Sequence, residues 1–209
     1  IIKNARDIIL YHDKEDNTLI AHARNPILIE NNALGYSITY VLKEFKLDFN
    51  KKELLYTGYP WFEEMVAPRV TIQKKWDWNR EISYKGSLMH LMRTLKQNNL
   101  EDEEFVIGAW FPDKPGPAIA DVDSLLDGDN FKYKGIMWVT YEAERENVKY
   151  KGNLSIGQQR SLIHFNNTVS IQGNGYYTDV NDIFLEGYLA WTEKISELLP
   201  LEYIPSQKK

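Results

Sequence analysis

Apolar and polar residues alternate with a period of two over much of the chain, which is the pattern of strands with one buried face. The clearest run covers 35–49, where the apolar residues occupy every second position up to Leu42 and change parity at Phe45. A one-residue bulge near Lys43 and Glu44 would keep both halves on one side of a sheet. We therefore expect a long strand at 35–49 with a bulge in its middle.

Further alternating runs, joined by short polar turns, predict a largely antiparallel sheet. Residues 7–11 and 18–24 form an expected hairpin, and the turn at 50–52 leads into a strand at 53–59 that Pro60 ends. Other strands are expected at 105–111, 134–143, 153–156, 161–165 and 168–171.

Two segments show the spacing of helices. In 71–97 the apolar positions recur at helical intervals, and Gly86 leaves either one kinked helix or two, with Ser87 capping the second. A C-terminal helix is expected from a cap at Asp179 to a stop at Pro200. The predicted fold class is α+β, with a largely antiparallel sheet, a long central helix and a C-terminal helix packed on it.

The segment 112–130 is rich in proline, glycine and aspartate. Such a composition is typical of a long surface loop that does not pack firmly. With no internal repeat and no clear linker, residues 1–209 are expected to form one domain. The chain begins with Ile1 instead of methionine, which predicts that an upstream domain or targeting segment precedes it.

Composition narrows the range of functions. The 43% hydrophobic share is typical of a folded globular chain, and a net charge of −5 argues against a nucleic-acid-binding protein. Apolar runs are far shorter than the ~20 residues that cross a bilayer, so no transmembrane segment is expected. Zero cysteines exclude disulfides, thiolate nucleophiles and cysteine-ligated zinc.

Metal-binding patterns are weak. The histidines show no spacing that would bring two of them onto one metal ion. Four aspartates on an acidic segment form a weak calcium candidate, although Leu125 and Leu126 stand where an EF-hand loop needs a ligand and a glycine. These aspartates are Asp121, Asp123, Asp127 and Asp129. No metal or other cofactor is expected.

Catalytic patterns are equally sparse. Ser87 and His90 are three residues apart on a predicted helix, but no GxSxG turn or orienting acid accompanies them. Glu63 and Glu64 are adjacent on a strand and would point to opposite faces. No catalytic residue is predicted, and an enzyme, such as a hydrolase of unknown type, ranks third among the possible functions.

The helix at 71–97 carries a polar stripe beside its apolar face. If the protein has a binding site, this stripe is the expected place, with Gly86 allowing a close approach. The residues of the stripe are Asn79, Ser83, His90, Arg93 and Gln97.

Arg80 falls on the apolar face of the same helix, between Trp76 and Leu91. A guanidinium keeps its charge, so burial requires hydrogen-bond partners. We expect a buried Arg80 with a structural role, paired with Glu63, Glu64 or Glu186 and stacked on the neighbouring rings of Trp76 and Tyr84.

Three stretches, 25–45, 56–95 and 186–203, resemble the C-terminal region of bacterial envelope proteins known as carboxypeptidase regulatory-like domain-containing proteins. The most specific element is W-x-x-N-R-x-x-x-Y-x-G-S-x-x-H, from Trp76 to His90. The resemblance implies a periplasmic or outer-membrane-associated location in a Gram-negative bacterium, and the family name does not imply peptidase activity. Besides residues of the polar stripe, the matching positions are Gly35, Tyr36, Gly58, Tyr59, Trp76, Arg80, Tyr84, Gly86 and Ser87.

Together these observations favour a non-catalytic domain of the cell envelope that acts as a scaffold or protein-interaction module. The alternative is a module that binds a glycan or peptide through aromatic residues and the polar face of the helix at 71–97. The expected partner is accordingly an envelope protein or a glycan.

Overall fold

The computed structural model describes residues 1–110, 117–119, 121–122 and 124–206. The chain divides into two compact units, Ile1–Arg80 (unit 1) and Glu81–Lys209 (unit 2). The expectation that 1–209 form a single domain stays a prediction. No helix within the described residues is long and apolar enough to cross a membrane.

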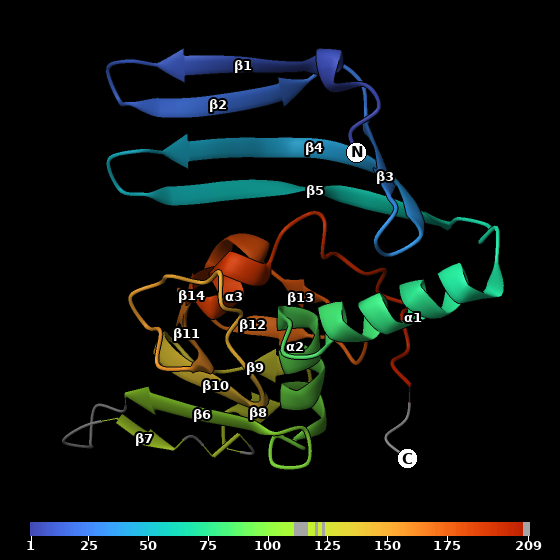
Figure 1. The fold of residues 1–209 in the computed structure, drawn as a ribbon. Coiled ribbons are helices and arrows are strands. Elements are labelled where there is room, and N and C mark those ends of the chain that lie inside the picture. The colour runs from blue at the N-terminus through green and yellow to red at the C-terminus, as the bar shows by residue number, and fades with distance from the viewer. Residues whose placement is uncertain (111–116, 120, 123, 207–209) are drawn as a thin grey trace. The chain divides into compact units, whose positions relative to one another are not determined.

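Unit 1 contains a five-stranded antiparallel sheet centred on β4 (Figure 1). Both β2 and β3 pair with one edge of β4, while β5 pairs with its other edge and β1 continues the sheet beyond β2. The pairing of β1 with β2 confirms the predicted N-terminal hairpin. The strands are β1 (Ile8–Asp13), β2 (Thr18–Ala23), β3 (Ile27–Asn31), β4 (Tyr36–Asp48) and β5 (Glu53–Glu64), after a short 3-10 turn η1 (Ala5–Asp7).

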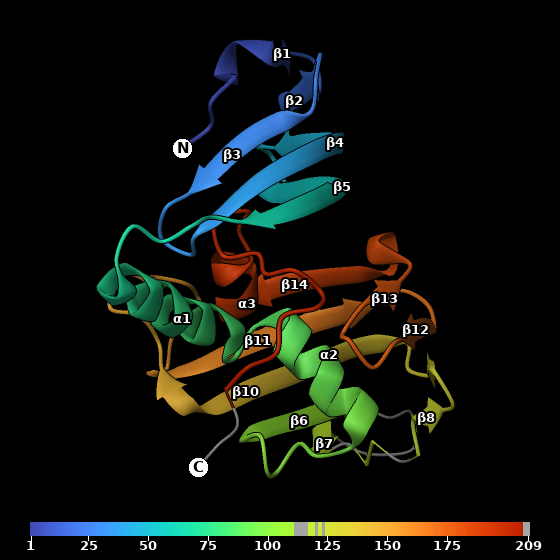
Figure 2. The same ribbon diagram turned by 90° about the vertical axis from the view of Figure 1, so that its right-hand side faces the viewer.

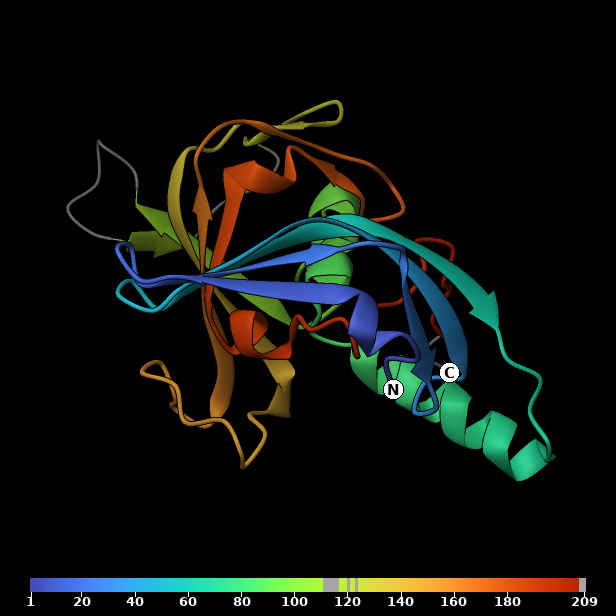
Figure 3. The same ribbon diagram turned by 90° about the horizontal axis from the view of Figure 1, so that it is seen from above.

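The long strands β4 and β5 run together over nearly their whole length (Figure 3). Their register shifts between Leu42 and Glu44, which confirms the predicted bulge. The expectation that Pro60 ends the second strand is wrong, because β5 continues to Glu64. Among the described strands β5 pairs only with β4, so a proline without an N–H is tolerated at its other edge.

The first part of helix α1 (Val70–Tyr84) belongs to unit 1 and packs on the turn that ends at Gly35. Gly35 has a φ of +71°, and a Cβ at this position would lie 2.3 Å from Cδ2 of Trp76. The Trp76 Nε1 donates a hydrogen bond of 2.9 Å to the carbonyl of Asn32. Only glycine permits both this backbone conformation and this close approach of the indole.

Unit 2 holds two antiparallel sheets, ordered β14-β11-β10-β6-β7 and β13-β12-β9-β8, with α2 lying near them (Figure 2). Its core combines α2 with both sheets and includes the fully buried Leu91, Met92, Leu95, Ile107, Phe131, Met137, Ile163 and Ile171. The elements are α2 (Leu88–Gln97), β6 (Phe105–Trp110), β7 (Pro117–Ile119), β8 (Leu126–Asp127), β9 (Asn130–Phe131), β10 (Gly135–Arg145), β11 (Gln158–Phe165), β12 (Val169–Ile171), β13 (Tyr177–Thr178), η2 (Val180–Asp182), β14 (Ile183–Gly187) and α3 (Tyr188–Thr192).

The predicted α+β class with a long central helix is wrong. The structure is mostly antiparallel sheet, with 42% strand and 18% helix, and the segment 71–97 forms two short helices. The break occurs at Gly86, whose φ is +69°, and Ser87 then caps α2 by accepting the N–H of His90 at 3.2 Å. A left-handed residue cannot continue an α-helix, so the two-helix alternative is the correct one.

The predicted C-terminal helix is also largely wrong. Residues 183–187 form β14, which pairs with β11 in the register Leu185↔Ile163, and only the five residues of α3 are α-helical, after the short 3-10 turn η2. Residues 183–185 form a short continuous apolar run, and periodicity alone does not distinguish a buried strand from a buried helix in such a run. The segment 153–156, predicted as a strand, consists of a turn and irregular chain.

The acidic segment 112–130 is more ordered in its described part than a surface loop. It contributes β7, β8 and the start of β9, and Val122, only 3% exposed, and Leu125 pack in the core of unit 2. Ile119 by contrast is exposed. The prediction of a surface loop is therefore wrong for the stretch around Val122 and Leu125, which contributes to the core.

Candidate functional site

The residues predicted as a binding stripe are divided between α1 and α2. Asn79 belongs to unit 1, where its Nδ2 donates to the carbonyl of Ala33 at 2.7 Å. Ser83, His90, Arg93 and Gln97 belong to unit 2.

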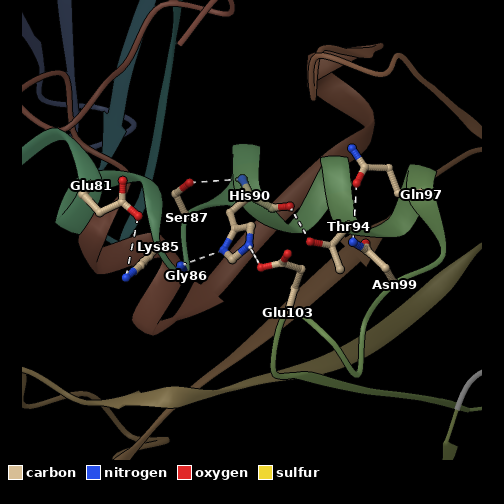
Figure 4. Close-up of polar contacts among 9 residues, drawn as sticks. All are labelled: Glu81, Lys85, Gly86, Ser87, His90, Thr94, Gln97, Asn99 and Glu103. Carbon is tan, nitrogen blue, oxygen red and sulfur yellow. Dashed lines mark hydrogen bonds and ion pairs between the residues drawn. The ribbon is translucent and has the colours of Figure 1, made fainter. Parts of the chain in front are cut away.

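His90 is 4% exposed and holds the break between the helices (Figure 4). Its Nδ1 accepts the backbone N–H of Gly86 at 3.2 Å, so the ring proton resides on Nε2, which donates to Oε2 of Glu103 at 3.2 Å. The Ser87 hydroxyl oxygen accepts from the backbone N–H of His90. This arrangement does not supply Ser87 with a ring nitrogen as a base, and the ring serves the structure.

Arg93 and Gln97 also make structural contacts. The three donor nitrogens of Arg93 bond main-chain carbonyls of Asn174, Leu201 and Tyr203 at 2.9–3.0 Å. Gln97 Oε1 accepts from Nδ2 of Asn99 at 3.4 Å, next to the C-terminus of α2 (Figure 4). Arg93 thus ties distant segments of unit 2 to α2, and Gln97 contacts the chain just after the helix.

Arg80 has the predicted structural geometry. It is 6% exposed, its Nε donates to the carbonyl of Leu34 at 2.7 Å, and its guanidinium also reaches the carbonyl of Gly35 and Oε1 of Glu64. The stacking partner is Tyr36, whose ring centroid is 4.0 Å from Cζ, in place of the predicted Trp76 and Tyr84. The carboxylate partner, Glu64, is one of the three predicted.

Two further positions from the resemblance lie in β5 and differ in their surroundings. A Cβ on Gly58 would lie 2.5 Å from the carbonyl oxygen of Val41, so this position requires glycine for packing. Tyr59 is 66% exposed. Tyr84, at the end of α1, is buried.

The weak calcium candidate does not assemble. Asp127 pairs with Lys132 at 2.5 Å, whose ammonium lowers the pKa of that carboxyl, and Asp129 pairs with Lys96. Asp121 is exposed, and Asp123 lies outside the described residues. Across the described ranges no group of three or more histidine, aspartate or glutamate side chains is placed to hold a metal ion.

Unit 2 contains a pocket of about 250 Å³ beside the break between α1 and α2. Its walls come from the end of α1 and the start of α2, from β10, β11 and the turn between them, and from α3 with the chain that follows. The lining residues are Ile82, Ser83, Lys85, Gly86, Ser87, Met89, Glu144, Asn147, Gln159, Tyr188, Trp191, Thr192, Glu193, Lys194, Glu197, Leu198 and Leu199.

Two of the carboxylates that line the pocket, those of Glu193 and Glu197, are bonded to the ends of the helices. Glu193 Oε1 accepts the N–H of Leu88, the first residue of α2, at 2.8 Å, and Glu197 Oε2 accepts the hydroxyl of Ser83 at 2.8 Å. Burial raises the pKa of Glu193, and the nearby charge of Glu197 raises it further.

The cations of the pocket are engaged within unit 2. Lys85 lies 3.6 Å from Oε1 of Glu81, and the Lys194 ammonium lies 4.3 Å from the ring centroid of Trp191. The pocket therefore combines an aromatic wall, apolar side chains and several acids, a mixture that binds a small amphipathic group better than it performs acid–base chemistry.

Sequence reasoning found part of this pocket. Ser83, from the predicted stripe, lines it together with Gly86 and Ser87, whereas His90, Arg93 and Gln97 do not. The acids and the tryptophan on the C-terminal side were missed. The signal for them was the high density of aromatic and charged residues after Gly187. The prediction of a C-terminal helix assigned these residues to the two faces of an amphipathic helix.

Comparison with known proteins gave no match to a family model, a curated protein or a solved structure. The resemblance to envelope proteins therefore stays an expectation.

Proposed function

We propose that the chain is a non-catalytic interaction module of the bacterial cell envelope. In this proposal the pocket of unit 2 binds one side chain, or another group of similar size, of a partner protein. The envelope location rests on the resemblance of the sequence. The pocket itself is the observation that carries the binding role.

The size and lining of the pocket support this role. A volume of about 250 Å³ falls below the roughly 300–1,000 Å³ typical of pockets for drug-sized molecules. It suits a single side chain, which a partner protein would insert while further contacts form around the rim. Trp191 and Tyr188 supply the kind of aromatic surface that is enriched where proteins bind each other.

The fixed roles of the polar groups support a non-catalytic reading. His90 uses both ring nitrogens to hold the helix break, and Ser87 caps α2. Glu193 is committed to the N-terminus of α2 by its bond to the N–H of Leu88. A general acid or base needs an atom within reach of a substrate, whereas these bonds serve the architecture.

A pocket-filling variant tests the proposal. We expect Ser83→Trp to block the pocket, while Ser124→Trp, at an exposed serine that does not line it, is the matched control. Each protein is used to capture partners from a Gram-negative envelope fraction, and any partner recovered is purified and its dissociation constant measured. Wild type and Ser124→Trp should bind alike, and Ser83→Trp at least ~10-fold more weakly. Equal binding by all three, with unchanged melting temperatures, would refute the role of the pocket.

A glycan-binding surface is the second candidate function, and unit 1 provides the observation that favours it. Tyr59 and Trp61 are 66% and 69% exposed and lie on the same face of β5. Exposed aromatic rings on one face of a sheet provide a platform on which sugar rings can stack. Trp61→Ala should weaken binding to a soluble polysaccharide panel, whereas Trp78→Ala, a 66% exposed tryptophan on α1, should not. Equal losses, or no binding by wild type, would remove this candidate.

A further inference from the structure

The walls of the pocket in unit 2 define the class of group that it can hold. Resting on the proposed function, we propose that the pocket binds an organic cation on an aliphatic stem, namely the lysine or arginine side chain of a partner peptide.

The aromatic wall is already in contact with a cation. Trp191 packs beside Tyr188 and Tyr150, with ring centroids 5.5 and 5.7 Å away, so its ring is held in place. The ammonium of Lys194 lies 4.3 Å from the Trp191 ring centroid. An ammonium or guanidinium over an indole face is a favourable arrangement, and it strengthens when water is excluded. Lys194 is exposed, so it can move into water when a ligand cation takes its place.

Charge complementarity points in the same direction. Three carboxylates line the pocket, from Glu144, Glu193 and Glu197, against two lysines. Lys85 is paired with Glu81, and Lys194 is the side chain that a ligand would displace.

The remaining lining matches the stem of a basic side chain. Ile82, Met89, Leu198 and Leu199 provide apolar surface in the same pocket. Lysine and arginine bury their methylene groups along such surface while the charged end meets acids or aromatic faces. A purely apolar side chain would fill the same space without offering a positive charge to the acids of the lining.

Titration calorimetry with short blocked peptides tests the inference on the whole chain. The peptides carry a single lysine, arginine or norleucine, and a free diamine shows whether the peptide backbone is needed. We expect the lysine or arginine peptide to bind, and the norleucine peptide to bind at least ~10-fold more weakly. A diamine that binds as tightly as the peptides would identify the free amine as the ligand source.

Charge variants complete the test. Glu197→Gln keeps an acceptor for Ser83 but removes the charge, and should weaken lysine-peptide binding about 10-fold, while the exposed Glu202→Gln, outside the pocket, should change it less than about twofold. The inference fails if neither basic peptide binds, if norleucine binds equally, or if Glu197→Gln has no effect. Partner capture lost in Ser83→Trp without any peptide binding would leave the proposed function standing and overturn only the cation. Peptide binding with partner capture unchanged in Ser83→Trp would support the cation site and overturn the proposed role of the pocket in partner binding.

Discussion

Two arginines on successive helices have similar structural roles in different units. Arg80, in α1, bonds the carbonyls of Leu34 and Gly35 in unit 1. Arg93, in α2, bonds three carbonyls of the C-terminal half of unit 2. Each guanidinium thus donates to carbonyls of turns and irregular chain, outside the strands and helices.

The two sites differ in what holds the arginine itself. Arg80 has the carboxylate of Glu64 at 3.2 Å and the ring centroid of Tyr36 at 4.0 Å. Arg93 instead donates to three carbonyls, and the ring centroid of Tyr84 lies 5.3 Å from its Cζ. The helical wheel assigned Arg80 to the apolar face and Arg93 to the binding stripe. The comparison shows that an arginine on a polar face can serve the fold as fully as a buried one.

The largest expected effect is at Arg80. Arg80→Lys keeps the charge but loses the bond geometry and should destabilise the protein by about 1–3 kcal/mol. Arg80→Ala should cost more, because the buried carbonyl of Leu34 loses the Arg80 donor and that of Gly35 keeps the N–H of Met65 alone of the two described donors. Chemical denaturation measures both, with the exposed Arg69→Ala as a control expected to lie within about 0.5 kcal/mol of wild type. Midpoints equal to wild type for both Arg80 variants would contradict the structural role.

A smaller loss is expected at Arg93. It is partly exposed, so water can replace some of its bonds, and Arg93→Ala should cost about 1–2 kcal/mol. The double variant His90→Ala/Arg93→Ala should lose more, because Gly86 and Glu103 also lose their partner in the ring. Thermal denaturation distinguishes a structural role from a binding role. A double variant that keeps its melting temperature but loses partner binding would show that both residues belong to a binding site.

The smallest effect is expected at Glu193 and depends on pH. Its pKa in the folded protein lies above the ordinary 4.5, so the native state retains a proton that the unfolded chain has lost. This contribution is fully favourable below about pH 4.5 and declines as the pH rises through the folded pKa. Glu193→Gln keeps an acceptor for Leu88 and should flatten this dependence. Glu193→Ala should flatten it equally and be about 1 kcal/mol less stable than Glu193→Gln, because the cap is lost as well.

Denaturation curves across pH 4 to about 8 measure this effect. Glu202→Gln removes an exposed charge of the same type and should leave the pH slope of wild type. If Glu193→Gln and Glu202→Gln show the same change of unfolding free energy with pH, the burial of Glu193 does not determine that pH dependence.

The sequence predicted what depends on neighbouring residues. The alternation around Leu42 and Phe45 revealed the bulge, and Gly86 with Ser87 marked the break between helices, because each is a local property of the backbone. Arg80 was predictable because a permanent charge on an apolar face admits few solutions.

The features that could not be predicted depend on contacts between residues far apart in the sequence. Residues 183–187 fit a helix by their own spacing, and only the edge of β11 makes them a strand. Val122 and Leu125 are apolar positions in an acidic segment, and their burial depends on the core that they meet. The pocket could not be predicted as a whole, because its walls come from 82–89, 144–159 and 188–199.

The bulge in β4 constrains how the length of this region can change in evolution. Loss of one residue between Leu42 and Glu44 would turn Phe45 and Leu47 to the opposite side of the sheet from Tyr36. A compensating insertion elsewhere in β4 would have to restore the parity before the turn at 49–52 is reached. Descendants of a common ancestor should therefore keep the number of residues from Tyr36 to Leu47 even where the residues themselves have been replaced.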